Sequence, residues 1–188
     1  KQSGVQRDVQ MRWRGKKDIV LGVEIMETLD YTIPVRIMDY DAQELQRQIK
    51  DIGGTHKEAV KQQKEQWGSA GEFLYGMKKE DRLMPVHTVA LYCGMEDYDG
   101  AKSILEMMDI ENVEEEYQGL LQDYPAKIYS LKYLKEENFE TSLREIIAIF
   151  KRSKDWKAMK EYYLAHKDRF RELDEISIDV MGALIGNR

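Results

Sequence analysis

Two acidic residues near the start of the chain, Asp8 and Glu24, could share a metal ion. Asp8 lies in the run "VQRDVQMRW", residues 5–13, and Glu24 lies in the alternating run "DIVLGVEIM", residues 18–26. Two neighbouring carboxylates can bind one Mg²⁺ through oxygens at about 2.0–2.1 Å, which leaves positions for water and a substrate phosphate. A metal held in this way lowers the pKa of bound water and offsets charge on the attacked phosphate. The pair could therefore serve metal-dependent phosphodiester hydrolysis if the two side chains share a face, whereas two acids on a hairpin are more often solvated surface residues.

The two runs flank a short glycine-containing loop, and this pattern predicts a β-hairpin. Directly opposed residues of an antiparallel pair have position numbers with a constant sum. A two-residue turn at Gly15-Lys16 gives a sum of 31 and places Glu24 opposite Arg7. A loop one residue longer gives 32 and places Glu24 opposite Asp8, with Cβ atoms about 4.5–5.5 Å apart. The sequence leaves both registers open.

Alternation along the second run divides its side chains between two faces. One face is wholly apolar and is expected to be core, whereas the other is mixed and is expected to border a cleft. The apolar face holds Ile19, Leu21, Val23 and Ile25, and the mixed face holds Val20, Gly22, Glu24 and Met26.

Pro34 predicts the start of a helix that follows the hairpin. Its apolar residues recur at steps of three and four, which predicts a core stripe, and polar residues lie opposite at the same spacing. The apolar set is Met38, Ala42, Leu45, Ile49 and Ile52, and the opposite set is Arg36, Tyr40, Gln43, Arg47 and Lys50. Gly53-Gly54 is expected to weaken or end this helix.

The remaining chain predicts two more strands and a helical tail. The nearly continuous apolar run at residues 83–94 is typical of a strand covered on both faces, and His87 within it is interpreted as a core histidine. Residues 126–134 are a further candidate strand. Ser142 and Glu145 form a capping-box pattern before the helical last fifty residues. These elements together predict an α/β or α+β domain.

Composition restricts the class of protein. The 188 residues are 42% hydrophobic and 34% charged, with one cysteine, Cys93, which rules out an internal disulfide and fits a cytoplasmic protein. No apolar run approaches the roughly 18 residues that span a bilayer, so we expect no membrane association. The net charge is −6, but the first 20 residues carry six basic and two acidic residues, whereas residues 95–116 carry nine acids and one lysine. One end could receive a phosphate backbone that the other repels.

Several segments, taken in order, resemble the Rpn-type recombination-promoting nucleases, a PD-(D/E)XK nuclease family also described as transposases. The likeness covers nearly the whole chain. The segments are "RDV", "LGVE", "YTIPVRIMDYDAQ", "LMPVHTVALYCGMEDYDGAKSILEMMD" and "TSLREIIAIFKRSKD".

The resemblance implies a restriction-endonuclease-like core at residues 1–134 and a helical extension at residues 135–188. It implies a DNA endonuclease that uses Mg²⁺ or Mn²⁺ and takes part in recombination or mobile-element biology. Asp8 and Glu24 match the metal ligands of the family. The family's site also includes a helix that we expect to precede Lys1. The family's "PVR…Y" segment matches Pro34, Arg36 and Tyr40. On the same predicted helix, Gln43 and Arg47 could also approach the metal site or the DNA backbone, so the candidates for DNA binding are Arg36, Tyr40, Gln43 and Arg47.

Met26 departs from the family pattern, because the family carries Gln, and the wider superfamily Lys, two residues after the glutamate. A thioether neither donates a hydrogen bond nor carries charge, so Met26 is expected to impair catalysis. The alternative hypothesis is a catalytically inactive relative that binds DNA or protein, and a third is a purely structural assembly protein. The apolar helical tail also suggests a homodimer.

Overall fold

The computed structural model describes residues 9–14 and 16–186 of the chain, and these residues form a mixed α+β fold, as predicted. The strands are β1 (Val9–Trp13), β2 (Ile19–Met26), β3 (Val86–Tyr92) and β4 (Lys127–Ser130). The helices are α1 (Ile33–Lys61), α2 (Ala70–Tyr75), α3 (Glu115–Gln118), α4 (Leu143–Arg152), α5 (Trp156–Ala165), α6 (Lys167–Arg171) and α7 (Glu175–Gly186). Short 3₁₀ turns lie at Leu105–Met107, Leu131–Tyr133 and Glu136–Asn138.

The hairpin register decides between the two alternatives left open by the sequence. β1 and β2 are antiparallel, and the described pairs run from Val9 opposite Val23 to Trp13 opposite Ile19. Every described pair has position numbers that add up to 32, so the register of 32 is confirmed and the register of 31 is wrong. Gln10 lies opposite Gly22 in this ladder.

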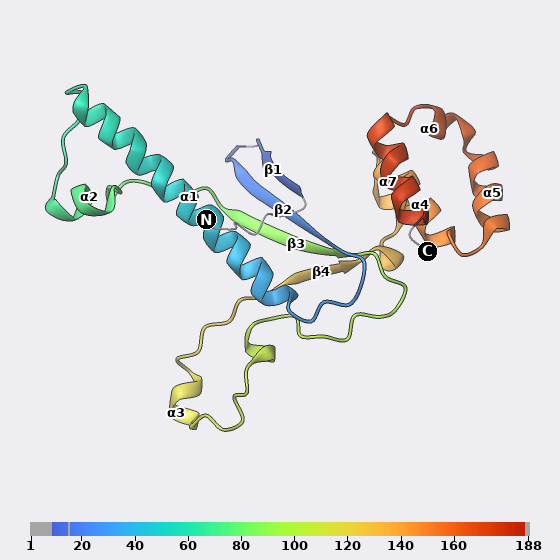
Figure 1. Cartoon of the computed structure of the whole chain (residues 1–188), viewed down its shortest axis with the longest axis horizontal. Coiled ribbons are helices and arrows are strands. Elements are labelled where there is room, and N and C mark those ends of the chain that lie inside the picture. The colour runs from blue at the N-terminus through green and yellow to red at the C-terminus, as the bar shows by residue number, and fades with distance from the viewer. Residues whose placement is uncertain (1–8, 15, 187–188) are drawn as a thin grey trace. The chain divides into compact units, whose positions relative to one another are not determined.

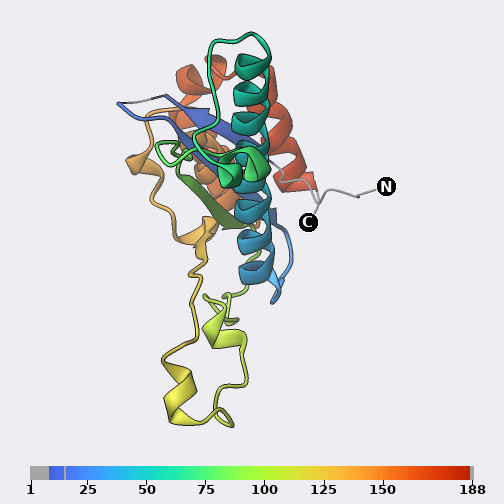
Figure 2. The ribbon, with the colours of Figure 1, turned by 90° about the vertical axis from the view of Figure 1, so that its left-hand side faces the viewer.

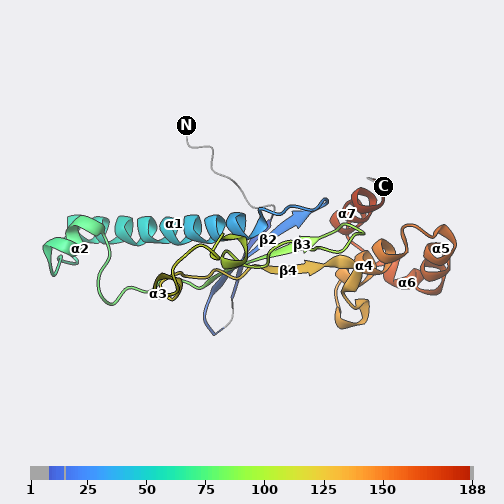
Figure 3. The same cartoon turned by 90° about the horizontal axis from the view of Figure 1, so that it is seen from below.

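The four strands form one sheet in the order β1-β2-β3-β4 (Figure 1). Two backbone bonds join β2 to β3 in the same direction along both strands, from Val20 N to the Pro85 carbonyl at 2.9 Å and from Cys93 N to the Met26 carbonyl at 2.7 Å. This order is that of a parallel pair, which requires a long crossover. The crossover contains α1, which runs along one face of β2 and β3 (Figures 1 and 3).

The predicted faces of β2 are the reverse of those observed. Val20, Gly22, Glu24 and Met26 are all buried, whereas the wholly apolar face is only half-buried, with Ile25 42% exposed. β3 alternates in the same way: Thr88, Ala90 and Tyr92 are buried and His87 is exposed. The expectations of two covered faces for β3 and of a core position for His87 are therefore wrong. The sheet turns its mixed face toward α1 because polar groups there find partners on the helix.

Helix α1 continues through the glycine pair that was expected to end it. It begins at Ile33, with Pro34 in its first turn, and extends to Lys61. A Cβ atom at Gly53 would lie 3.1 Å from the carbonyl oxygen of Gly76, the residue that ends α2 with a φ of 70°. The glycine therefore permits a close approach of the α2 turn to α1.

The chain divides into two compact units. The first contains the chain up to Glu24, residues 31–90 and residues 101–127, and the second contains residues 25–30, 91–100 and 128–188. Within the first unit, the segment around α3 extends away from the sheet (Figures 1 and 2). Its base is closed by an antiparallel bridge between Ser103 and Pro125.

The second unit holds helices α4 to α7 and two apolar clusters. Cys93 packs with Leu131, Ile147 and Phe150 in one cluster, and Met181 packs with Ile146 and Ile149 in the other. Ser142 makes no capping bond to α4, so the capping-box prediction is wrong, but Asp155 accepts a bond from Ala158 N at 3.0 Å and caps α5.

No helix in the described part of the chain is both long and apolar enough to cross a membrane.

Candidate functional site

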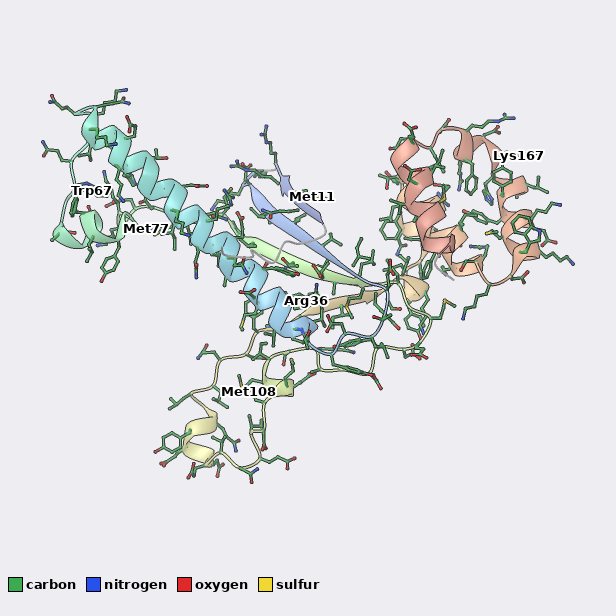
Figure 4. The ribbon with its side chains drawn as sticks, viewed as in Figure 1. Met11, Arg36, Trp67, Met77, Met108 and Lys167 are labelled. Atoms are coloured by element: carbon green, nitrogen blue, oxygen red, sulfur yellow. The ribbon has the colours of Figure 1, made fainter. Side chains whose placement is uncertain are left out.

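Glu24 lies on the covered face of β2, at the position where the sequence placed a metal ligand. It is 2% exposed. One of its carboxylate oxygens, Oε1, accepts a bond from the guanidinium of Arg36, which lies in the first turn of α1 (Figure 4). The same guanidinium donates to the Tyr40 hydroxyl oxygen at 3.1 Å. The structure therefore brings together three of the predicted site residues, Glu24, Arg36 and Tyr40.

The second oxygen of Glu24 is buried and accepts no hydrogen bond from the described residues. An ionised carboxylate in such a place is expensive to bury unless both of its oxygens find partners. Arg36 neutralises the charge but satisfies only Oε1. Oε2 is therefore the atom of this site that could bind a cation.

The other predicted catalytic positions are placed as follows. Asp8 lies outside the described residues. Met26 follows Glu24 by two residues in β2 and is 3% exposed. Its thioether offers no hydrogen-bond donor for positioning a water molecule, and Mg²⁺ prefers oxygen ligands.

A row of buried polar residues continues from Arg36 along the covered face of α1. Three of its members are Asp41, Glu44 and Gln48, each 3–5% exposed. Asp41 accepts bonds from the Thr88 hydroxyl at 2.5 Å and the Tyr124 hydroxyl at 2.6 Å. Its carboxylate thus joins α1 to β3 and to the base of the α3 segment.

Gln48 binds the backbone just before β3 in both directions. Its Oε1 accepts from Met84 N at 2.7 Å, and its Nε2 donates to the Met84 carbonyl at 3.4 Å. This pair of bonds resembles one rung of a sheet ladder, so it fixes the level at which α1 lies on the sheet.

Among the described residues, Glu44 is contacted by three polar side chains. It accepts bonds from Arg47 Nε at 2.8 Å, from Arg47 Nη2 at 2.7 Å and from Gln10 Nε2 of β1 at 3.1 Å, and Gln48 Nε2 adds a contact at 3.2 Å. The Arg47 bonds are the largest influence and hold the pKa of the Glu44 carboxyl below its ordinary value, although burial acts in the opposite direction. Glu44 is therefore ionised at neutral pH.

The four residues expected to bind DNA separate into two settings. Arg36 and Tyr40 belong to the Glu24 site, whereas Gln43 donates to Asp39 at 2.7 Å on the exposed side of α1. Arg47 is 54% exposed and divides its guanidinium between Glu44 and Asp51. Gln43 is thus not part of the site, and Arg47 lies at its rim.

The predicted core stripe of α1 is wrong, and this error hid most of the site. Met38 and Ala42 are exposed, and Leu45, Ile49 and Ile52 are only half-buried. The buried residues are instead Ile33, Pro34, Ile37, Tyr40, Asp41, Glu44, Gln48 and Gly53. Hydrophobic periodicity assigns polar residues to solvent, so it could not place these. The signal that could have found them is the regular spacing of Arg36, Tyr40, Glu44 and Gln48, four residues apart.

Within the described residues, no group of three or more His, Cys, Asp or Glu side chains is arranged to hold a metal ion. Glu24 and the residues of the buried row therefore form no cation site on their own. A site at Glu24 would need Asp8 as a further ligand.

Comparisons with protein-family models, curated proteins and solved structures give no match for this chain.

Proposed function

We propose that this chain carries a nuclease site of the PD-(D/E)XK type on a restriction-endonuclease-like core, with Asp8 and Glu24 as ligands of Mg²⁺ or Mn²⁺. The observation that carries the proposal is the hairpin register, in which position numbers add up to 32. We extend this ladder by one residue and take Asp8, which lies outside the described residues, as the partner of Glu24. The cross-strand Cβ distance for such a pair is about 4.5–5.5 Å, within the span of one ion.

Several properties of Glu24 support its proposed role. The side chain is almost completely buried, one oxygen accepts from Arg36, and the other has no hydrogen-bond partner in the described structure. When bound, the divalent ion would supply an activated water and charge stabilisation for the attacked phosphate. Arg36 would keep the carboxylate in place and balance its charge before the ion enters. Because Tyr40 accepts from the same guanidinium, it would orient Arg36.

The proposed substrate is DNA, approached at the end of the chain that carries the basic residues. Arg36 lies beside the proposed metal ligand and is 38% exposed, so it could also contact a bound phosphate. Arg47, at the rim, would contribute charge rather than base recognition. We further propose a cytoplasmic site of action and a homodimer, since two copies would offer one site for each DNA strand.

The test is cleavage of supercoiled plasmid by the full chain in Mg²⁺ and in Mn²⁺. We expect weak, metal-dependent nicking that is lost in Asp8→Asn and in Glu24→Gln. Gln62→Ala provides a matched control. The amide of Gln62, just after the end of α1, donates to the exposed carboxylate of Glu58 and is not part of the proposed site. Nicking that survives both carboxylate substitutions would rule out this site as its source. Sedimentation of the same samples tests the homodimer.

A second candidate function is favoured by Met26 and by the ion pair between Arg36 and Glu24. Both would suit a relative that retains the fold but binds DNA or protein without cutting. It predicts no cleavage by the unaltered chain, together with DNA binding that does not depend on divalent metal. Gain of cleavage in Met26→Gln or Met26→Lys would support this alternative.

A further inference from the structure

The helices of the second unit enclose an apolar cavity that the proposed nuclease site does not use. α4 packs against both α5 and α7, and α5 packs against α6 (Figure 1). Side chains from all four helices line a cavity of about 260 Å³. Its floor is made by Ile149 of α4, Met159 of α5 and Met181 of α7. Because Ile149 and Met181 are buried and pack in one cluster, this floor belongs to the core of the unit.

The rim of the cavity consists of large side chains that stay exposed. Trp156 of α5 is 71% exposed, and Tyr163 of α5 and Ile178 of α7 are exposed as well. Phe170 of α6 fixes the Tyr163 ring in an edge-to-face contact, with the ring centroids 5.1 Å apart. Exposed apolar residues that surround a hollow, rather than lying singly, are typical of a binding site.

Helix α5 contributes one continuous stripe to the lining. The stripe consists of Trp156, Met159, Lys160 and Tyr163. These positions are separated by three, one and three residues, so they share one face of the helix. At a rise of 1.5 Å per residue, the stripe is about 10 Å long. An elongated ligand can therefore lie along it.

The charge of the lining comes from α5. Lys160 is the one charged residue among the described side chains that line the cavity. An exposed lysine covers apolar surface with its alkyl stem and keeps its ammonium group in water, which places a positive charge at the mouth. Glu161 and Asp179 are exposed and each follows a lining residue by one position, but successive residues of a helix do not share a face. The cavity thus combines an apolar interior with a cationic mouth.

The volume limits the size of the ligand. A dry cavity of about 150 Å³ binds benzene, which corresponds to about 25 Å³ for each carbon atom. On this scale the 260 Å³ of the cavity accommodate an apolar body of about ten carbon atoms. A helical peptide would need room for several anchoring side chains over two turns. The volume therefore favours a small molecule over a peptide helix.

We propose that this cavity binds a small amphiphilic carboxylate, whose elongated apolar body lies along the α5 stripe and whose carboxylate lies beside Lys160. Burial of the apolar body supplies most of the affinity, since it removes apolar surface from water. The ion pair is exposed and contributes less, but it selects an anion over a neutral molecule of the same shape. The inference does not depend on the proposed nuclease function, because the cavity lies in the second unit and Glu24 in the first.

The test titrates the full chain with sodium decanoate and follows the methionine methyl groups by NMR. Of the ten methionines of the chain, Met159 and Met181 are the two that line the cavity in the described structure. We expect both to shift saturably with a Kd of about 1 mM or lower, whereas the exposed Met107 and Met108 should not shift. Equal shifts at Met107 and Met108 would indicate general adsorption to apolar surface and would overturn the proposal.

A charge substitution tests the cationic mouth. Lys160→Gln should weaken decanoate binding by about twofold to fivefold and leave the binding of 1-decanol, which has a hydroxyl in place of the carboxylate, unchanged. Lys167→Gln is the matched control, since Lys167 is an exposed lysine of α6 outside the lining (Figure 4). An equal effect of both substitutions, or an equal effect on decanoate and decanol, would exclude Lys160 as the recognition residue.

A volume substitution tests the cavity itself. Ile178→Trp should fill part of it and weaken decanoate binding by at least about tenfold, whereas Val180→Trp, an exposed position of α7 outside the lining, should not. Thermal unfolding shows that each variant is folded. A second copy of this chain is the competing occupant. The proposal is wrong if decanoate fails to bind and Ile178→Trp, but not Val180→Trp, converts a dimer into a monomer in sedimentation.

Discussion

The carboxylate of Glu24 and the guanidinium of Arg36 form an ion pair that joins β2 to the first turn of α1. The two partners differ in their surroundings, since the Glu24 side chain is 3% exposed and that of Arg36 is 38% exposed. A buried anion is thus neutralised by a cation that reaches it from the surface. Such a pair fixes the helix on the sheet. Arg36 is bonded to Oε1 of Glu24, whereas Oε2 is the candidate cation position, so a substitution of Arg36 can remove the counter-ion without altering the candidate ligand.

Arg36→Met tests whether Glu24 accepts a metal when its counter-ion is removed. The substitution should lower the free energy of unfolding by about 1–3 kcal/mol, because it leaves a buried carboxylate without its donor. Millimolar Mg²⁺ should then raise the melting temperature of the variant more than that of the unaltered chain. In Arg36→Met/Glu24→Gln the extra effect of Mg²⁺ should vanish. An equal Mg²⁺ effect in all three proteins would argue against Glu24 as a metal ligand.

The buried carboxylate of Glu44 should make the chain sensitive to acid. Its pKa is lowered in the folded state, chiefly by the bonds from Arg47. A carboxyl whose pKa is lower in the folded state stabilises the fold at pH values above its pKa in the unfolded chain, about 4.3. This stabilisation is lost as the pH falls through the pKa of the folded state. Unfolding in urea between pH 7 and pH 3 should therefore show a smaller difference between the unaltered chain and Glu44→Gln as the pH falls. A difference that is constant over this range would contradict the prediction.

The contribution of His56 to stability should depend on pH in the opposite sense to that of Glu44. Its Nδ1 lies 2.9 Å from Glu65 and its Nε2 lies 2.9 Å from Asp81, so both ring nitrogens face carboxylates. These contacts, with Glu65 first, raise the pKa of His56 above its ordinary value, and Lys78 also contacts Glu65 at 2.8 Å. A histidine whose pKa is higher in the folded state stabilises the fold fully at pH values below its pKa in the unfolded chain, about 6.5. This stabilisation is lost as the pH rises through the pKa of the folded state.

An NMR titration of the His56 ring checks this directly. The midpoint should lie above that of a model peptide and should fall in Glu65→Gln and in Asp81→Asn. Urea unfolding should show that the advantage of the unaltered chain over His56→Gln declines as pH rises past this midpoint. A ring that titrates identically in all three proteins would show that the two carboxylates do not hold the proton.

The adjacent glycines Gly53 and Gly54 should respond to alanine with opposite sign. A Cβ at Gly54 meets no atom within 4 Å, so Gly54→Ala should stabilise the chain by about 0.5–1 kcal/mol through the higher helix propensity of alanine. A Cβ at Gly53 would lie 3.1 Å from the Gly76 carbonyl oxygen and 3.4 Å from its Cα. Gly53→Ala should therefore be destabilising by about 1 kcal/mol. Thermal unfolding of both variants provides the comparison, and equal stabilisation by both would show that α2 does not pack closely on α1.

Local signals in the sequence were sufficient to predict the hairpin and the start of the helix that lie nearest to the site. The alternation of residues 18–26, the glycine-containing loop and Pro34 predicted the hairpin and the start of α1, because each depends on the chain's own geometry over a few residues. They also restricted the register to two values. Gly53 shows where this reasoning failed, because α1 continues through it. The missing side chain instead makes room for Gly76, which is distant in sequence.

The sequence by itself determined that Glu24 and Met26 share a face of one strand, since alternation fixes this whatever packs on it. Only the tertiary structure decided that this mixed face, and not the apolar one, lies under α1. The physical reason is that Asp41, Glu44 and Gln48 each find bonds to groups far away in the chain, which makes their burial tolerable. Hydrophobic periodicity contains no information about such partners, so the polar layer that surrounds the candidate site appeared only in three dimensions.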